Sequence, residues 1–297
     1  MKKLYHDISA EKQKEYIPNG NISKLIESFW ISSANNEKVI LAPEGVFRII
    51  YSSGSLSLAC NGEKKIYHLQ SGFYLIPINT QLITIKHSKV LIGIKMKIFT
   101  LSYLLNNNSN LNYNNLELFT NNTENNNFYK QFNEEIQEVN QLVNKLKDCN
   151  KLNEFIPFLE NFMHGIFSKE FFRLDETLRN KVNYILQRRG NIRIDDMAKE
   201  FNESRQNLHR YFMKHLRISP KQLGNIWKIN NFIYLNNNNN DRSLTNSALG
   251  ANYFDQAHCI NEFKKQFYFS PKYLRRKNMT FTTNCINNRF NGQYDPK

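Results

Sequence analysis

Glycine and cysteine are scarce, and each shortage excludes a class of protein. Only 11 of the 297 residues are glycine. No G-x-x-x-x-G-K-S/T, G-x-G-x-x-G or G-x-S-x-G motif occurs, so the usual phosphate-binding loops and the serine-hydrolase elbow are missing. The four cysteines lie far apart without a C-x-x-C pair, which argues against a zinc ribbon or a disulfide scaffold. We expect inert free thiols at Cys60, Cys149, Cys259 and Cys285.

Metal-ligand spacings and long hydrophobic runs are also missing. The seven histidines show no H-x-H or H-E-x-x-H spacing, so a metal-dependent barrel oxygenase would lack its ligands. No segment approaches the ~18 consecutive apolar residues of a membrane helix. No apolar run follows Met1-Lys2-Lys3, so we expect no signal peptide. These absences predict a cytoplasmic protein with no cofactor, no membrane partner and no enzymatic activity.

Acidic residues are few in the second half of the chain. The whole chain has 40 Lys and Arg against 26 Asp and Glu, a formal net charge of +14. Residues 1–175 hold 19 basic and 17 acidic side chains, whereas residues 176–297 hold 21 and 9. This asymmetry predicts a polyanion partner for the second half, with a merely solvated basic face as the alternative.

The first third of the chain predicts a β-rich domain. Short segments rich in Ile, Val, Leu, Phe and Tyr are separated by turn residues such as Pro43-Glu44-Gly45 and Asn61-Gly62. Closely spaced strands of this kind predict a small sandwich or barrel. The predicted strands are Lys38–Leu41, Val46–Tyr51, Ser55–Cys60, Lys64–Leu69, Gly72–Ile78, Gln81–Lys86 and Lys89–Phe99.

A helical connector and several Asn-rich tracts follow the strands. Residues 128–147 carry a narrow apolar stripe, which fits either packing on the protein's own barrel or a dimer seam. Residues 152–172 form a second, very aromatic helical stretch. Loops are predicted where Asn is concentrated, because Asn competes for its own backbone. These tracts are Asn106–Asn110, Asn121–Asn127 and Asn236–Asn240.

The C-terminal third contains an internal repeat, which indicates a duplicated helical unit. Ala198, Leu208, Phe212, Ser219 and Pro220 are echoed by Ala248, Cys259, Phe263, Ser270 and Pro271. Asn202 and Asn252 stand at the turns, and Ser204 and Asp255 are the N-caps of the helices that follow. The predicted helices are Glu176–Arg189, Ile194–Phe201, Arg205–Leu216, Pro220–Leu235, Leu244–Ala251 and Gln256–Phe267.

Each copy therefore predicts a helix-turn-helix. The second helix of each copy has an apolar back and Gln, His, Arg or Lys on its front, the chemistry that reads base edges in a major groove. The helix between the copies would hold the two reading helices in successive groove turns, ~34 Å apart.

On these segments, residues 176–277 resemble the DNA-binding domain of the AraC/XylS family of transcription regulators. The first copy contributes Ile194-Asp195-Asp196-Met197-Ala198, then Ser204, Leu208-His209-Arg210 and Phe212, and then Ile218-Ser219-Pro220. The second copy carries the stronger signature, in Asp255-Gln256-Ala257-His258, Glu262-Phe263-Lys264-Lys265 and Phe269-Ser270-Pro271-Lys272-Tyr273-Leu274-Arg275. The chain departs from the family at Arg217 and Tyr268, where glycine is usual, and at Cys259, where an aromatic residue is usual. A positive φ at Arg217 or Tyr268 would cost up to ~1–2 kcal/mol.

The resemblance also implies which side chains meet DNA. The implied base readers are Gln206, His209, Arg210, Gln256, His258 and Asn261. Basic side chains suit phosphate, which adds affinity without sequence choice; they are Arg205, Lys214, Lys264 and Lys265. The β-rich half resembles the family's sensor domains more weakly, and this implies effector binding or dimerisation. The segments that carry this likeness are Pro43-Glu44-Gly45, Arg48-Ile49-Ile50-Tyr51 and Val90-Leu91-Ile92-Gly93-Ile94-Lys95.

We therefore expect an α+β protein, with a β-rich sandwich or barrel domain followed by an all-α domain with two helix-turn-helix units joined by a linker helix. The expected boundaries are a sensor domain at 1–122, a connector at 123–173, a DNA-binding domain at 174–278 and a polar tail at 279–297. The expected function is a sequence-specific transcription regulator. Expected partners are promoter double-stranded DNA, a small-molecule effector, RNA polymerase and a second copy of the chain. The alternatives are a degenerate regulator that binds DNA nonspecifically or acts through protein contacts, and a β-barrel enzyme fused to a DNA anchor.

Overall fold

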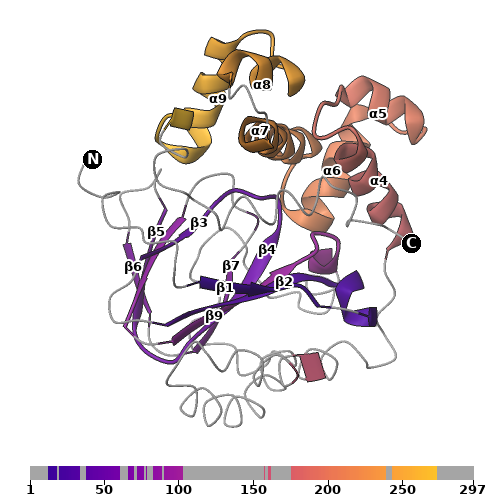
Figure 1. Ribbon diagram of the computed structural model, residues 1–297. Coiled ribbons are helices and arrows are strands. Elements are labelled where there is room, and N and C mark those ends of the chain that lie inside the picture. Colours follow the sequence, from indigo (N-terminus) through magenta and orange to yellow (C-terminus); the bar gives the residue numbers. More distant parts are fainter. Residues whose placement is uncertain are drawn as a thin grey trace. The chain divides into compact units, whose positions relative to one another are not determined.

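The protein folds into two units, a β unit and a helical unit. The computed structural model describes residues 13–18, 20–33, 38–60, 66–69, 72–76, 78, 83–88, 90–102, 157, 160–161, 175–238 and 243–272. The β unit comprises Met1–Ile40, Val46–Pro77 and Thr84–Leu174, and the helical unit comprises Leu41–Gly45, Ile78–Ile83 and Asp175–Lys297. Figure 1 draws the strands in indigo to purple and the later helices in red to yellow.

The β unit contains two sheets. The five-stranded sheet has the order β1-β2-β9-β4-β7 and the four-stranded sheet the order β3-β8-β5-β6. The strand pairs β1–β2, β2–β9, β9–β4, β4–β7 and β5–β6 are antiparallel. The strands are β1 (Gln13–Tyr16), β2 (Ile26–Ser33), β3 (Lys38–Leu41), β4 (Phe47–Ser52), β5 (Leu56–Cys60), β6 (Ile66–Leu69), β7 (Gly72–Ile76), β8 (Ile83–His87) and β9 (Val90–Met96), and a short 3-10 helix, η3 (Gly20–Lys24), lies between β1 and β2.

The core of the β unit lies along β2, β4 and β9. All six residues of β4 are buried, as are the last six of β9, because these strands occupy the interior of the larger sheet. Trp30 on β2 pairs with Gly93 on β9. A Cβ atom at Gly93 would come within 2.1 Å of the Trp30 ring atom Cζ2, so the indole lies where only glycine leaves room for it.

The seven predicted strands are confirmed as β3 to β9, with ends shifted by a few residues. The sequence did not predict β1 or β2. Strand β2 carries Phe29, Trp30 and Ile31 in one apolar run without alternation, and all three are buried. A continuous apolar run is typical of a strand that is covered on both faces. A run of three residues also fits a buried helix, however, so the sequence alone does not identify it as a strand.

The helical unit consists of six helices among the described residues. They are α4 (Glu176–Gln187), α5 (Ile194–Glu200), α6 (Arg205–Leu216), α7 (Pro220–Asn238), α8 (Leu244–Gly250) and α9 (Gln256–Phe267). Figure 1 shows α7 between α4, α5 and α6 on one side and α8 and α9 on the other. Helix α7 packs against α4, α6, α8 and α9. Its buried residues include Leu223, Trp227 and Phe232. The predicted two-unit helical architecture with a linker helix is therefore confirmed.

Close backbone contacts fix the linker helix to its neighbours. Gly190 has a φ of +78°, and a Cβ atom there would lie 2.1 Å from the main-chain oxygen of Gly224 on α7. Within the same unit, Trp227 Nε1 donates a hydrogen bond to the main-chain oxygen of Glu44 at 3.2 Å. Asn230 Nδ2 donates to the main-chain oxygen of Pro43 at 3.3 Å. Helix α7 therefore forms the centre of the helical unit.

One loop prediction is wrong. The tract Asn236–Asn240 was expected to be a loop, but α7 continues to Asn238. Asn236 is only 2% exposed, and Asn238 Nδ2 donates to the main-chain oxygen of Tyr234 at 3.0 Å. Packing of the helix in its unit therefore overrides the low helix propensity of Asn.

Other predictions fall on residues that the structure does not describe. The Asn tracts at 106–110 and 121–127 and the apolar stripe at 128–147 lie entirely outside the described residues, and the tail at 279–297 does too. Of the aromatic stretch at 152–172, only residues 157, 160 and 161 are described, and they are helical. No helix in the described part of the chain is long and apolar enough to cross a membrane.

Candidate nucleic-acid interface

The two helix-turn-helix units share one local geometry. In each, a 7-residue helix is followed by a 12-residue helix: α5 and α6, then α8 and α9. Ser204 Oγ accepts a hydrogen bond from the Asn207 N–H at 3.1 Å, and Asp255 Oδ1 accepts from the His258 N–H at 2.7 Å. The predicted N-caps are therefore confirmed, and each satisfies a backbone donor that the helix leaves free.

The backbone at the turns and helix ends explains the residues found there. Asn202 and Asn252 adopt φ values of 52° and 60°, as predicted for the two turns. Arg217 and Tyr268, where glycine was the expected residue, follow α6 and α9 with φ values of 55° and 62°. Side chains with a Cβ atom are strained in this left-handed region. In both helix-turn-helix units the residue after the second helix therefore has the left-handed conformation that favours glycine, although it is Arg217 in one and Tyr268 in the other.

Buried apolar residues anchor one side of each 12-residue helix. Leu208 and Phe212 of α6, and Cys259 and Phe263 of α9, are fully buried. The Phe263 ring stacks on Phe267 with a centroid distance of 4.4 Å and an interplanar angle of 8°. The opposite side of each helix consequently faces away from the core. Nine of the ten predicted DNA-contacting residues are exposed, and Gln256 is half-buried; the nine are Arg205, Gln206, His209, Arg210, Lys214, His258, Asn261, Lys264 and Lys265.

Several side chains on the front of α6 already have partners within the chain. The Arg205 guanidinium forms an ion pair with Asp195 of α5. Arg210 donates a hydrogen bond to the side-chain oxygen of Asn207, one turn earlier in α6. Both contacts are exposed, so water screens them and a phosphate or a base edge can replace them. His209 and Lys214 lie on the same exposed side.

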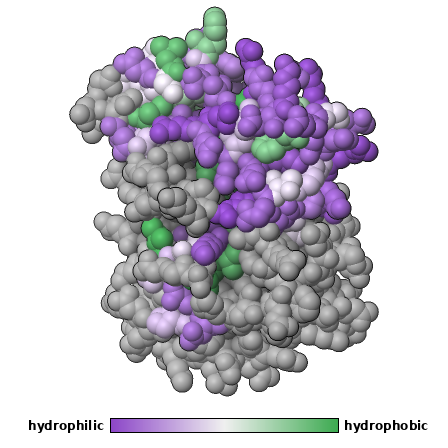
Figure 2. All heavy atoms as spheres, turned by 90° about the vertical axis from the view of Figure 1, so that its right-hand side faces the viewer, coloured by the Kyte–Doolittle hydropathy of each residue, from purple (hydrophilic) through white to green (hydrophobic). Residues whose placement is uncertain are grey.

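The front of α9 is also polar. Gln256 Oε1 accepts a hydrogen bond from Thr245 Oγ1 of α8 at 2.7 Å, which fixes the amide at the start of the helix. The His258 ring packs edge-on against Tyr253 with a centroid distance of 5.5 Å. Lys265 Nζ lies 2.6 Å from Glu262 Oε1. Figure 2 views the molecule from the side of α4, α5 and α6, and the described surface of these helices is mostly hydrophilic.

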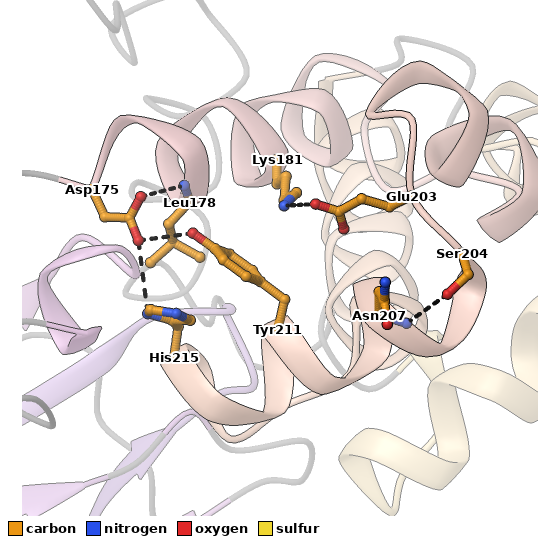
Figure 3. A network of polar contacts seen from close by, with 8 residues as sticks. All are labelled: Asp175, Leu178, Lys181, Glu203, Ser204, Asn207, Tyr211 and His215. Carbon is orange, nitrogen blue, oxygen red and sulfur yellow. Dashed lines mark hydrogen bonds and ion pairs between the residues drawn. The ribbon is translucent and has the colours of Figure 1, made fainter.

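A polar network lies behind α6 and joins it to α4 (Figure 3). Asp175 is the N-cap of α4, and its Oδ1 accepts from the Leu178 N–H at 3.0 Å. Its other oxygen, Oδ2, accepts a hydrogen bond from the Tyr211 hydroxyl at 2.8 Å and lies 3.8 Å from His215 Nδ1. One carboxylate therefore caps α4 and holds two side chains of α6.

A buried lysine completes this network. Lys181 of α4 is 1% exposed, and its Nζ lies 2.7 Å from Glu203 Oε1 in the turn before α6. The same Nζ lies 3.8 Å from the centroid of the Tyr211 ring, a favourable cation–π distance. A buried charge is tolerated when it has such partners. The Lys181–Glu203 pair therefore ties α6 and the turn before it to α4.

The network shifts the pKa values of its members. Burial raises the pKa of the Tyr211 hydroxyl, and the hydrogen bond to Asp175 raises it further. Burial alone would raise the pKa of Asp175, but hydrogen bonds from the Leu178 N–H and the Tyr211 hydroxyl hold it below its usual value. Burial lowers the pKa of His215 against the opposing pull of Asp175. At neutral pH the network therefore consists of a carboxylate, a phenol and a neutral imidazole.

The second unit uses a different arrangement behind α9. Lys228 of α7 lies over the Tyr253 ring, with Nζ 4.3 Å from the centroid. Burial lowers the pKa of Lys228, and nearby Lys221 lowers it further. Burial raises the pKa of the Cys259 thiol to about 12, which confirms an inert free thiol at this position. No group of three or more His, Cys, Asp or Glu in the described ranges could hold a metal ion.

Sequence reasoning missed the residues behind α6. Lys181 lies three residues after Leu178 and four before Ile185, so it falls on the buried stripe of α4. A lysine on such a stripe is a signal for a buried partner. The partner could not be named, because Glu203 lies 22 residues further along the chain. The same holds for Tyr211 and Asp175, 36 residues apart.

Comparison with solved structures finds similar chains at low sequence identity. A 1.65 Å structure of ToxT from Vibrio cholerae has 16% identity and a TM-score of 0.46, and the match covers 92% of this chain and 99% of that one. ToxT bound to an unsaturated fatty acid has 14% identity and a TM-score of 0.46, with 90% and 96% covered. The AraC-like transcriptional activator CuxR has 10% identity and a TM-score of 0.26, with 67% and 79% covered. No family model and no curated protein sequence matches the chain.

Proposed function

We propose that this chain is a DNA-binding transcription regulator of the AraC/XylS type that reads two successive major-groove segments. The observation that carries the proposal is the duplicated geometry of α6 and α9. Each is a capped helix of 12 residues with a buried apolar side and an exposed polar side. A helix of this kind, preceded by a short helix and a tight turn, is the recognition helix of a helix-turn-helix.

The linker helix supports reading by both units at once. Helix α7 packs against helices of both units. Its 19 residues correspond to ~28 Å at 1.5 Å per residue, comparable with the ~34 Å between successive major-groove turns. We assign base contacts to Gln206, His209, Arg210, Gln256, His258 and Asn261, and phosphate contacts to Arg205, Lys214, Lys264 and Lys265.

For the β unit we propose binding of a small-molecule effector or of a second copy of the chain, with RNA polymerase as a further partner at the promoter. The resemblance of Arg48-Ile49-Ile50-Tyr51 and Val90-Leu91-Ile92-Gly93-Ile94-Lys95 to sensor segments supports this assignment. Sedimentation of the full chain, with and without target DNA, tests the second copy. A monomer on DNA under all conditions would exclude dimerisation as the mode of control.

The test of DNA reading uses the full chain and a randomised duplex pool. Duplexes selected over several rounds should share two short motifs one helical turn apart, and should bind at least 1,000-fold tighter than bulk DNA at physiological salt. The logarithm of the binding constant should fall linearly with the logarithm of the salt concentration. Equal affinity for selected and bulk DNA would favour the alternative, a degenerate regulator that binds nonspecifically. Absence of binding would contradict both.

A further inference from the structure

Phe254 is the most exposed large hydrophobic side chain among the described residues, with 88% of its surface in solvent. It lies in the turn between α8 and α9, directly before the N-cap Asp255. The turn is held on both sides of it. Tyr253 is 5% exposed, and Asp255 accepts a hydrogen bond from the His258 N–H at 2.7 Å. A well-anchored turn therefore presents a benzyl group to solvent at the start of α9.

The first unit has different chemistry at the equivalent positions. Glu203 lies 51 residues before Phe254, and it bonds to buried Lys181. Gln206 lies 51 residues before Ala257, and both are exposed. The first helix-turn-helix unit thus uses its turn to fasten the helix and has Gln206 at the position of Ala257. The second unit instead has two exposed apolar side chains, Phe254 and Ala257, three residues apart.

We propose that Phe254, together with Ala257, contacts the C5-methyl group of a thymine in the half-site read by α9. This inference rests on the proposed function. The thymine methyl is the apolar group that base pairs display in the major groove, and Ala and Phe are side chains that contact it. The first residues of a recognition helix are the ones that reach base edges; Ala257 is one of them, and Phe254 directly precedes the N-cap of the same helix. Phe254 is therefore a specificity-determining residue of the second unit.

Charge favours DNA over another protein as the occupant of this surface. Exposed Lys264 and Lys265 lie on the same helix, and exposed His258 follows Ala257 directly. Lys264 and Lys265 place positive charge on the helix that carries Ala257, which suits a polyanion partner. A duplex would neutralise them with phosphate while its bases meet the apolar pair.

The experiment measures the contribution of single thymine methyl groups. In the duplex selected with the full chain, each thymine is replaced in turn by deoxyuridine, which lacks only the C5-methyl group. Wild-type protein should bind about fourfold more weakly at one thymine of the second half-site, the value expected for one buried methyl. Phe254→Ala should lose most of this difference between the thymine and deoxyuridine duplexes, because only Ala257 then contacts the methyl group, and Phe254→Leu should lose less of it.

A matched control separates this contact from general effects. Leu249 on α8 is 51% exposed, and Leu249→Ala should retain the full deoxyuridine effect. The melting temperature of Phe254→Ala should equal that of wild type, because the ring is exposed. The inference is overturned if Phe254→Ala retains the deoxyuridine effect, or if no thymine methyl matters to wild type. If wild type does not distinguish selected from bulk DNA, the proposed function itself fails and this inference fails with it.

Discussion

The hydroxyl of Tyr211 donates a hydrogen bond to Asp175 Oδ2 at 2.8 Å, and this bond ties α6 to the N-cap of α4. Tyr211 lies on the half-buried side of α6, one residue from the exposed Arg210. The orientation of the first recognition helix therefore depends on a residue 36 positions earlier in the chain.

Tyr211→Phe removes this hydrogen bond and little else. We expect the free energy of unfolding to fall by about 1–2 kcal/mol, because the lost bond has a charged acceptor that stays partly buried. Urea denaturation followed by circular dichroism measures the change. Tyr184→Phe is the control, because the Tyr184 hydroxyl donates to no residue in the described part of the chain. An equal loss in both variants would contradict the role of the bond.

Removal of Glu203 and removal of Lys181 should lower the free energy of unfolding by different amounts. Glu203→Ala leaves the Lys181 charge buried, so we expect a loss of about 3 kcal/mol in unfolding free energy. Lys181→Met should cost less, because the charge it leaves without a partner is on Glu203, which is 27% exposed, whereas Lys181 is 1% exposed. The double variant should be more stable than Glu203→Ala alone. As the control, Glu262→Ala breaks the pair with Lys265, a side chain that is 70% exposed, and should cost about 0.5 kcal/mol or less.

His215 should make stability depend on pH. Its pKa is lowered in the folded protein by burial and by Lys214 and Lys181, and Asp175 opposes the shift. The unfolded chain therefore binds the proton more readily. Stability is fully present above pH ~6.5, the ordinary histidine value, and falls as the pH drops toward the lowered folded-state pKa. Denaturation from pH 8 to pH 5 should show this step. His215→Gln should remove it and His209→Gln should leave it, whereas a step in both variants would assign it elsewhere.

The protein should become more stable when Arg217 is replaced by glycine. Its φ of 55° is left-handed, and glycine adopts this conformation without the Cβ penalty, so Arg217→Gly should raise the unfolding free energy by about 1 kcal/mol. Arg217→Ala keeps the Cβ atom and should bring no such gain. Thermal denaturation of the two variants compares them directly. If alanine stabilises as much as glycine, loss of the arginine side chain is the cause.

Arg210 and Lys264 should differ in their effect on DNA binding. Arg210→Ala should weaken binding to the selected duplex by about 1–3 kcal/mol and relax the preference at one base pair. Lys264→Ala should weaken binding to all duplexes alike and reduce the salt slope by about one. Fluorescence anisotropy with a set of single-base variants measures both effects. Uniform loss in both variants would show that the division into base readers and phosphate contacts is wrong.

Local signals made the helices predictable. The predicted helices Arg205–Leu216 and Gln256–Phe267 agree with α6 and α9 at both ends. Each begins at a side-chain cap, Ser204 or Asp255, and is followed by a Ser-Pro pair that marks its end, and both signals lie in neighbouring residues. By contrast, β2 depends on its pairing with β9, more than 50 residues later. The partners of Lys181 and Tyr211 are likewise distant in sequence, so spacing and composition could not reveal them.

The linker helix ended later than predicted for a related reason. Asn236 is buried in the helical unit, and that burial comes from packing against helices that lie elsewhere in the chain. Composition alone favours a loop for a run of asparagines. Only the assembled unit shows that the first three of them continue the helix.

The matching left-handed residues Arg217 and Tyr268 have a consequence for how the two helix-turn-helix units can differ. A large basic residue and a large aromatic residue occupy the same backbone conformation, so the two units share the path of the chain there but not its chemistry. Side chains on the exposed faces of α6 and α9 can therefore differ without a change in the backbone. The two units can in this way prefer different base sequences while both pack against α7.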